Sequence, residues 1–189
     1  SMRYRLINEK FPVWEIDEFI LPDIDLQTVK TYDQGYVSSS SHLRQQCKPA
    51  LDQKFFCDVW DEHTKELQRY MRNEMNDIEE VRQMWMGNLQ NFVYPPFSLS
   101  GEFIEDKEGF DMAPHIDNRN VVGVLIINLI NNPDNSGTRF VDMSYNGPTK
   151  KHTGVFMLNN YNTRHGIVNP GPGNRLIGYQ MLHIDSICK

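Results

Sequence analysis

Two histidines and one aspartate form the clearest chemical pattern in the sequence. His115 and Asp117 are separated by one residue where an extended segment is about to begin, so both side chains can point to one face. His165 lies in a turn that enters another β-type run. Two imidazoles and a carboxylate can hold one face of an octahedral metal ion and leave three positions open. Open positions indicate a catalytic centre, because a metal enclosed by protein ligands on all sides is structural.

Arg175 begins the next β-type run after His165. Its guanidinium presents a fixed fork of hydrogen-bond donors, which suits the far carboxylate of a dicarboxylic co-substrate such as 2-oxoglutarate. If Arg175 did not fill this role, Arg164 and Arg139 would be the next candidates.

Other acid–histidine clusters in the sequence are weaker candidates. His183 and Asp185 repeat the spacing of His115 and Asp117, but no histidine or arginine follows them. His63 follows two acidic residues inside a strongly amphipathic segment, where a solvated charged face is the better interpretation.

The elements that must position these residues change character along the chain, which predicts the α+β class. Residues 48–75 carry apolar side chains at three- and four-residue spacings and are expected to form an amphipathic helix. A second helix is expected over 76–89, where an asparagine and a later glutamate resemble a capping box. Residues 11–21 alternate like a strand, and a short helix is expected through Leu26 and Val29.

The second half of the chain contains short β-type runs that are separated by turn clusters rich in Asn, Gly and Pro. Strands without intervening helices favour an antiparallel sandwich or barrel, with the helix of residues 48–75 covering one face of a sheet. A plain solvated loop is one interpretation of the acidic segment 102–111. The expected strands cover residues 97–104, 121–130, 138–141, 154–158, 166–168 and 176–184.

Composition restricts the possible classes of protein. The chain has 189 residues, 39% hydrophobic and 23% charged, which favours a single domain over residues 1–189. A net charge of -6 with scattered basic residues argues against double-stranded nucleic acid as a partner. No apolar run is long enough to span a membrane. Three cysteines without paired spacing, Cys47, Cys57 and Cys188, argue against a disulfide framework and predict a cytoplasmic location.

The ordered set of His115, Asp117, His165 and Arg175 resembles the Fe(II)/2-oxoglutarate-dependent dioxygenase superfamily, and within it the prolyl 4-hydroxylase-like branch. Residues 11–22, 136–140 and 148–156 are also similar to segments of that branch. The resemblance implies a double-stranded β-helix (jelly roll) over about residues 94–186. Flanking N-terminal helices and strands would support it over about residues 1–93.

Site roles follow from the same resemblance. It implies that Arg175 binds the distal carboxylate of 2-oxoglutarate and that iron is held by His115, Asp117 and His165. Many members have Ser or Thr two residues after the arginine, whereas this chain has Ile177. Either a different hydroxyl completes the carboxylate pocket, for which Tyr94 is a candidate, or the pocket stays less polar. The resemblance also implies a mobile lid over the substrate as the second interpretation of segment 102–111.

The implied activity is a dioxygenase that couples decarboxylation of 2-oxoglutarate to hydroxylation of an unactivated C–H bond, with ascorbate as a candidate accessory reductant. A protein or peptide prolyl residue is the favoured substrate, although related folds also act on small molecules. Three alternatives stay open: a cupin-like metal- or ligand-binding module, an interaction domain with coincidental histidines, and a zinc hydrolase.

Overall fold

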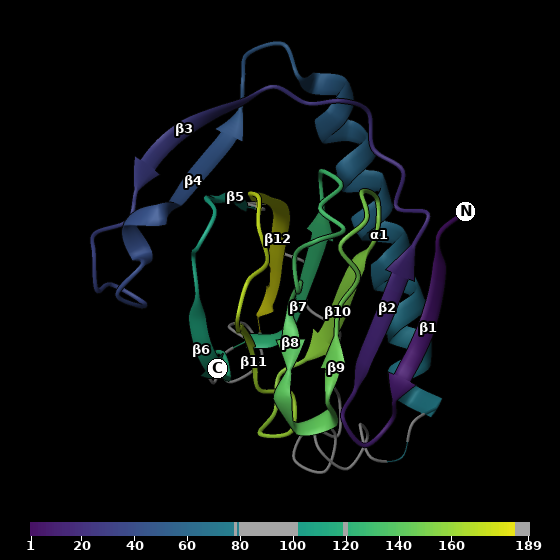
Figure 1. The fold of residues 1–189 in the computed structure, drawn as a ribbon. Coiled ribbons are helices and arrows are strands. Elements are labelled where there is room, and N and C mark those ends of the chain that lie inside the picture. Colours follow the sequence, from purple (N-terminus) through teal and green to yellow (C-terminus); the bar gives the residue numbers. More distant parts are fainter. Residues whose placement is uncertain (78, 80–101, 119–120, 184–189) are drawn as a thin grey trace, which may run out of the picture.

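The computed structural model describes residues 1–77, 79, 102–118 and 121–183, and these residues form two antiparallel sheets and one α-helix. The large sheet has the strand order β1-β2-β10-β7-β12-β5-β4-β3, and the small sheet has the order β6-β11-β8-β9. Figure 1 shows the small sheet on one side of the large sheet and α1 on the other. The expected α+β class is confirmed.

The described elements have the following bounds. Two short 3-10 helices cover Ser41–Leu43 and Val141–Met143. The α-helix and strands are α1 (Lys54–Asp77), β1 (Arg3–Asn8), β2 (Val13–Asp17), β3 (Leu26–Thr31), β4 (Arg44–Pro49), β5 (Glu102–Asp106), β6 (Met112–His115), β7 (Val121–Asn128), β8 (Arg139–Phe140), β9 (Tyr145–Asn146), β10 (Gly154–Leu158), β11 (His165–Ile167) and β12 (Arg175–His183).

The large sheet is built around β7, which lies between β10 and β12. The sequence of β7, VVGVLIIN, is buried except at its last residue. Such a continuous apolar run suits a strand that is covered on both faces, and its β-branched residues pack well on a pleated surface. This run therefore forms the buried centre of the sheet, which can support a site on one face.

Helix α1 covers one face of the large sheet, as the sequence predicted. Phe56 and Trp60 are buried along the apolar stripe of this helix. The ring of Trp60 lies 5.4 Å from that of Phe103 on β5, and it also passes over Gly178 on β12. A Cβ at position 178 would lie only 2.4 Å from the indole Cη2, so glycine allows the helix to approach the sheet.

The face of the large sheet opposite α1 carries a second apolar layer. Ile104 on β5, Ile126 on β7 and Ile177 on β12 are buried and belong to one hydrophobic cluster with Phe140 of the small sheet. Because side chains alternate along each strand, these positions share one face. This layer lies between the two sheets and forms the floor of the candidate site.

The expected short helix through Leu26 and Val29 is wrong, because these residues belong to strand β3. β3 pairs with β4, and the register shifts between Thr28 and Lys30. A bulge adds one residue to a strand and breaks its two-residue alternation. The three-residue spacing that resembled a helix therefore arises from a bulge at Val29, which is exposed.

Two further helix boundaries differ from the sequence prediction. Helix α1 begins at Lys54, because the preceding residues 44–49 form β4. The helix continues to Asp77, so the asparagine that was expected to cap a second helix lies within it. No glycine or proline interrupts residues 54–77, and the helix has no reason to stop earlier. The rest of the expected second helix lies outside the described residues.

Segment 102–111 is not a lid over its whole length. Residues 102–106 form β5, which lies between β12 and β4 inside the large sheet. Only residues 107–111 form a connection, in which Phe110 is buried. Its acidic composition suggested a loop, but Phe103 and Ile104 anchor the strand on the two faces of the sheet.

None of the helices in the described part of the chain combines the length and the apolar character needed to cross a membrane.

Candidate metal centre

The small sheet brings His115 and His165 together. His115 ends β6 and His165 begins β11, and the two residues are directly paired across these antiparallel strands. Their imidazole rings lie 4.6 Å apart, centroid to centroid. Directly opposed residues in an antiparallel pair place their side chains on the same face. The register therefore places both imidazoles side by side.

Asp117 joins the two histidines from the segment that directly follows β6. Its main-chain N–H donates to Oδ1 of Asn159, which directly follows β10 (3.1 Å). Nδ2 of Asn159 lies within hydrogen-bond distance of the main-chain oxygens of Asp117, Asn118 and Val121, at 3.2, 2.9 and 3.0 Å. Asn159 therefore holds the main chain at Asp117, which presents the carboxylate, a role that the sequence alone did not indicate.

The hydrogen bond at Nδ1 of each imidazole determines that Nε2 is the nitrogen that can bind a metal. His115 Nδ1 lies 3.0 Å from the carbonyl oxygen of Ala113, and His165 Nδ1 lies 3.0 Å from that of Thr163. A carbonyl oxygen can only accept, so both Nδ1 atoms carry the proton and donate it. The two Nε2 atoms are then left with free lone pairs, which is the usual arrangement of histidine metal ligands.

The three potential ligand atoms converge on one point. Nε2 of His115 lies 4.0 Å from Asp117 Oδ1, and Nε2 of His165 lies 3.7 Å from Asp117 Oδ2. One ligand atom from each residue falls within 4.8 Å of the others, and in the described residues this is the only His, Cys, Asp or Glu group that could hold a metal in this way.

The electrostatics of the cluster also fit a cation. Burial lowers the pKa of His165 below its ordinary value, although the nearby Asp117 carboxylate opposes the shift. The neutral imidazole is the form that binds a metal. Oδ2 of Asp117 is buried and has no hydrogen-bond partner among the described residues. A buried unpartnered carboxylate oxygen is costly, and a metal ion at this point would remove that cost.

A cavity of about 360 Å³ connects this cluster to Arg175. Arg175 is 6% exposed, and burial lowers the pKa of its guanidinium while Asp106 raises it. Nη1 donates to Asp106 Oδ2 (3.3 Å) and Nη2 donates to Thr138 Oγ1 (3.2 Å). The floor between the His115, Asp117 and His165 cluster and Arg175 is apolar and includes Ile177.

Thr138 is a hydroxyl that the sequence analysis did not single out. Because its oxygen accepts from Arg175, its own proton is available to a ligand in the cavity. The glycine before it and the alternation of residues 138–141 marked a strand, but not the side on which Thr138 lies. Tyr94, the hydroxyl that the sequence suggested, lies outside the described residues. Tyr179 also lines the cavity, and burial raises the pKa of its phenol.

The competing histidines have other surroundings. His63 on α1 contacts the main-chain oxygen of Ile20 at 2.6 Å and packs against the ring of Phe19. The side chain of His183 and the whole of Asp185 lie outside the described residues. The alternative arginines pair with residues of the small-sheet region: Arg164 with Asp142, and Arg139 with Asn146.

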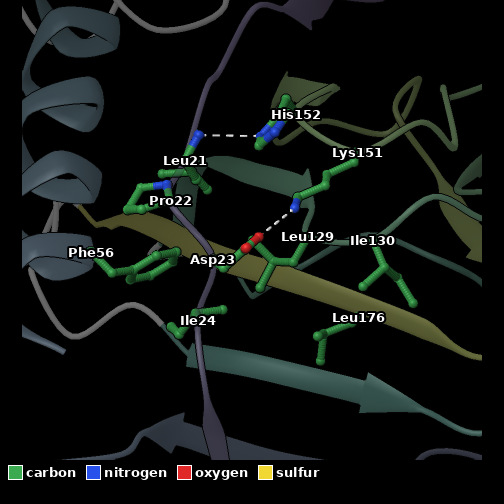
Figure 2. Close-up of a pocket in the computed structure, with 10 residues that line it drawn as sticks. All are labelled: Leu21, Pro22, Asp23, Ile24, Phe56, Leu129, Ile130, Lys151, His152 and Leu176. Atoms are coloured by element: carbon green, nitrogen blue, oxygen red, sulfur yellow. Dashed lines mark hydrogen bonds and ion pairs between the residues drawn. The ribbon is translucent and has the colours of Figure 1, made fainter. Parts of the chain in front are cut away.

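A second cavity, of about 200 Å³, lies beneath the segment between β2 and β3. Figure 2 shows that its polar groups bind one another: Lys151 pairs with Asp23 at 3.0 Å, and the main-chain N–H of Leu21 donates to His152 Nδ1 at 3.2 Å. These contacts tie the segment to the turn before β10. The polar groups of this cavity therefore have a structural role.

Comparison with known proteins supports the fold. No protein-family model and no curated protein matches the sequence. Among solved structures, a Pseudomonas putida prolyl-4-hydroxylase is similar with a TM-score of 0.52 and 16% identity, over 74% of this chain and 68% of that one. A viral collagen prolyl hydroxylase from Paramecium Bursaria Chlorella virus-1, in a 2OG complex, is similar with a TM-score of 0.51 and 13% identity, over 89% of this chain and 94% of that one.

At such low identities these similarities establish the fold and not the chemistry. The expected jelly roll, and the resemblance to prolyl hydroxylases at the level of fold, are confirmed.

Proposed function

We propose that the protein is an Fe(II)- and 2-oxoglutarate-dependent dioxygenase that hydroxylates an unactivated C–H bond. The iron ligands would be His115, Asp117 and His165, and Arg175 would bind the co-substrate. The observation that carries the proposal is the convergence of the two free Nε2 atoms on the Asp117 carboxylate, whose buried Oδ2 has no hydrogen-bond partner among the described residues. Two imidazoles and one carboxylate are the facial set used by non-haem iron oxygenases.

The protein side chains have distinct tasks in this reaction. The carbonyls of Ala113 and Thr163 hold the imidazoles with Nε2 toward the metal position. Arg175 and the Thr138 hydroxyl bind the distal carboxylate and so orient the 2-oxo acid toward the cluster. The isoleucine floor limits water around the reacting groups. When bound, iron supplies the redox chemistry that couples 2-oxoglutarate decarboxylation by dioxygen to C–H hydroxylation.

Two features support 2-oxoglutarate as the co-substrate. A buried arginine at the end of a cavity that begins at the candidate metal ligands suits a molecule with a chelating end and a distant carboxylate. One of the similar structures is a prolyl hydroxylase described in a 2OG complex. The same fold similarity supports a prolyl residue in a protein or peptide as the substrate class.

We place the enzyme in the cytoplasm as one catalytic domain over residues 1–189, and the free thiols Cys47 and Cys57 agree with a reducing compartment.

Turnover without the prime substrate tests this function. Purified protein with Fe(II), ascorbate, 2-oxoglutarate and air is expected to release succinate slowly, and prolyl-containing peptides are expected to accelerate the release. Asp117→Ala removes a ligand and should abolish it. Asp23→Ala changes an exposed carboxylate at the second cavity and should leave it unchanged. Absence of succinate from iron-loaded wild-type protein, across a panel of peptides and metabolites, would contradict the proposal and favour a non-catalytic binding module.

A further inference from the structure

Three charged residues form a row across neighbouring strands at the arginine end of the cavity. Arg44 on β4 lies directly opposite Asp106 on β5, and Asp106 lies directly opposite Arg175 on β12. β5 is the strand between the other two. Directly opposed residues share one face of a sheet, so the register alone places the aspartate between two arginines.

The Asp106 carboxylate binds both guanidinium groups. It accepts from Arg44 Nε (2.7 Å) and Nη2 (3.0 Å), and from Arg175 Nη1 (3.3 Å). The side chain of Asp106 is only 2% exposed, while those of Arg44 and Arg175 are 15% and 6% exposed. Through these three hydrogen bonds the buried carboxylate restrains the positions of both guanidinium groups.

Arg44 keeps one donor group free at the cavity. Its guanidinium carbon lies 4.4 Å from the centre of the Phe110 ring, and its Nε and Nη2 edge faces Asp106. Nη1 has no hydrogen-bond partner in the described part of the chain, and Arg44 lines the same cavity as Arg175. A guanidinium stacked on a ring and held along one edge is pre-organised to bind a second anion with its remaining edge.

The charges of this row sum to one net positive charge. Two guanidinium groups and one carboxylate leave an excess that matches a single carboxylate of a ligand. Glu102, the acidic residue of β5 that lines the cavity, lies at the opposite end of that strand from Asp106 and contacts Gln46.

We propose that Arg44 is a second basic residue of the co-substrate pocket, which contacts the distal carboxylate together with Arg175, and that Asp106 positions both guanidinium groups. This inference rests on the proposed function, since it assigns the specificity of the same site. The pair of arginines then selects 2-oxo acids that carry a distal carboxylate over those that end in an uncharged group.

The test compares 2-oxoglutarate with 2-oxopentanoate, which lacks the distal carboxylate. Dissociation constants are measured by calorimetry on Fe(II)-loaded protein without oxygen, and their ratio gives the preference for the dicarboxylate. A charge-assisted hydrogen bond corresponds to a factor of about ten or more. Arg44→Gln is therefore expected to lower the preference at least about tenfold and to leave 2-oxopentanoate binding unchanged. Arg3→Gln, which breaks an exposed ion pair on β1, is the matched control.

A second variant tests whether Arg44 contacts the ligand directly or acts only by pairing with Asp106. Arg44→Gln combined with Asp106→Asn removes one positive and one negative charge, so no buried carboxylate is left without its partner. If Arg44 contacts the ligand, the double variant still shows a preference several-fold below wild type. A preference restored to the wild-type value would overturn the direct contact, as would an unchanged preference in the single variant.

The outcomes also separate this inference from the proposed function. Wild-type protein that binds neither 2-oxo acid would contradict the function itself. A wild-type preference for 2-oxoglutarate that survives in both Arg44 variants would contradict only the role of Arg44.

Discussion

Removal of the Asn159 side chain should weaken metal binding although Asn159 is not a candidate ligand. Its Oδ1 accepts from the Asp117 N–H, and its Nδ2 contacts the main-chain oxygens of Asp117, Asn118 and Val121. Because Nδ2 has two protons, the side chain makes about three effective hydrogen bonds, each worth about 0.5–1.5 kcal/mol. Asn159 is partly buried, so in Asn159→Ala water can replace some of these hydrogen bonds.

We therefore expect Asn159→Ala to weaken Fe(II) binding by about 1.5–3 kcal/mol, because Asp117 is no longer held in position. Changes at residues that orient metal ligands reduce metal affinity by about 10–100-fold, or about 1.4–2.8 kcal/mol, which agrees with this figure. Anaerobic Fe(II) titration of wild-type and Asn159→Ala protein measures the effect.

The matched control is Asn128→Ala. Asn128 is also partly buried, and its Nδ2 contacts Pro148 and Thr153 oxygens (2.7 and 3.0 Å to the carbonyls). This variant should lower stability similarly while keeping the Fe(II) affinity of wild type. Equal Fe(II) affinities for wild type and Asn159→Ala would refute the positioning role of Asn159, as would equal losses in the two variants.

Two further predictions concern stability. The metal-free protein should lose stability as pH falls below about 6.5, because burial lowers the pKa of His165 in the folded state and the unfolded chain then binds more protons. Urea unfolding at several pH values should show that the free energy of unfolding depends less on pH in His165→Asn than in wild type. An equal pH dependence in the two proteins would argue against the pKa shift. Gly178→Ala should cost about 1–3 kcal/mol, because the new Cβ would lie 2.4 Å from Trp60 Cη2. The cost should shrink in a Trp60→Leu background, and an equal cost in both backgrounds would rule out this clash.

The sequence predicted those elements whose pattern is local. β10 was expected at residues 154–158 and lies there, because its apolar run is bounded by a turn and by polar residues. The helix that covers the sheet was likewise evident from the spacing of residues such as Phe56 and Trp60. β3 escaped detection because its bulge breaks the alternation, and β6 because it is short and contains Pro114, which an edge strand tolerates.

The candidate metal ligands could be selected from the sequence because residue type and order limit their chemistry. Their supporting residues could not. Arg44, Asp106 and Thr138 lie far apart in the chain, and only the register of β4, β5 and β12 and the path of the small sheet bring them to Arg175. Register depends on the packing of whole sheets, which no short motif records.

The most direct test of the central claim is a titration of 2-oxoglutarate into Fe(II)-loaded protein without oxygen, followed by visible absorbance. Iron that is chelated by a 2-oxo acid absorbs visible light, so the band reports that both groups share one centre. We predict a band that saturates at one co-substrate per protein and that is lost in His165→Ala. Binding of 2-oxoglutarate without any such band, at the same affinity with and without iron, would contradict the assignment of this cluster as the catalytic metal centre.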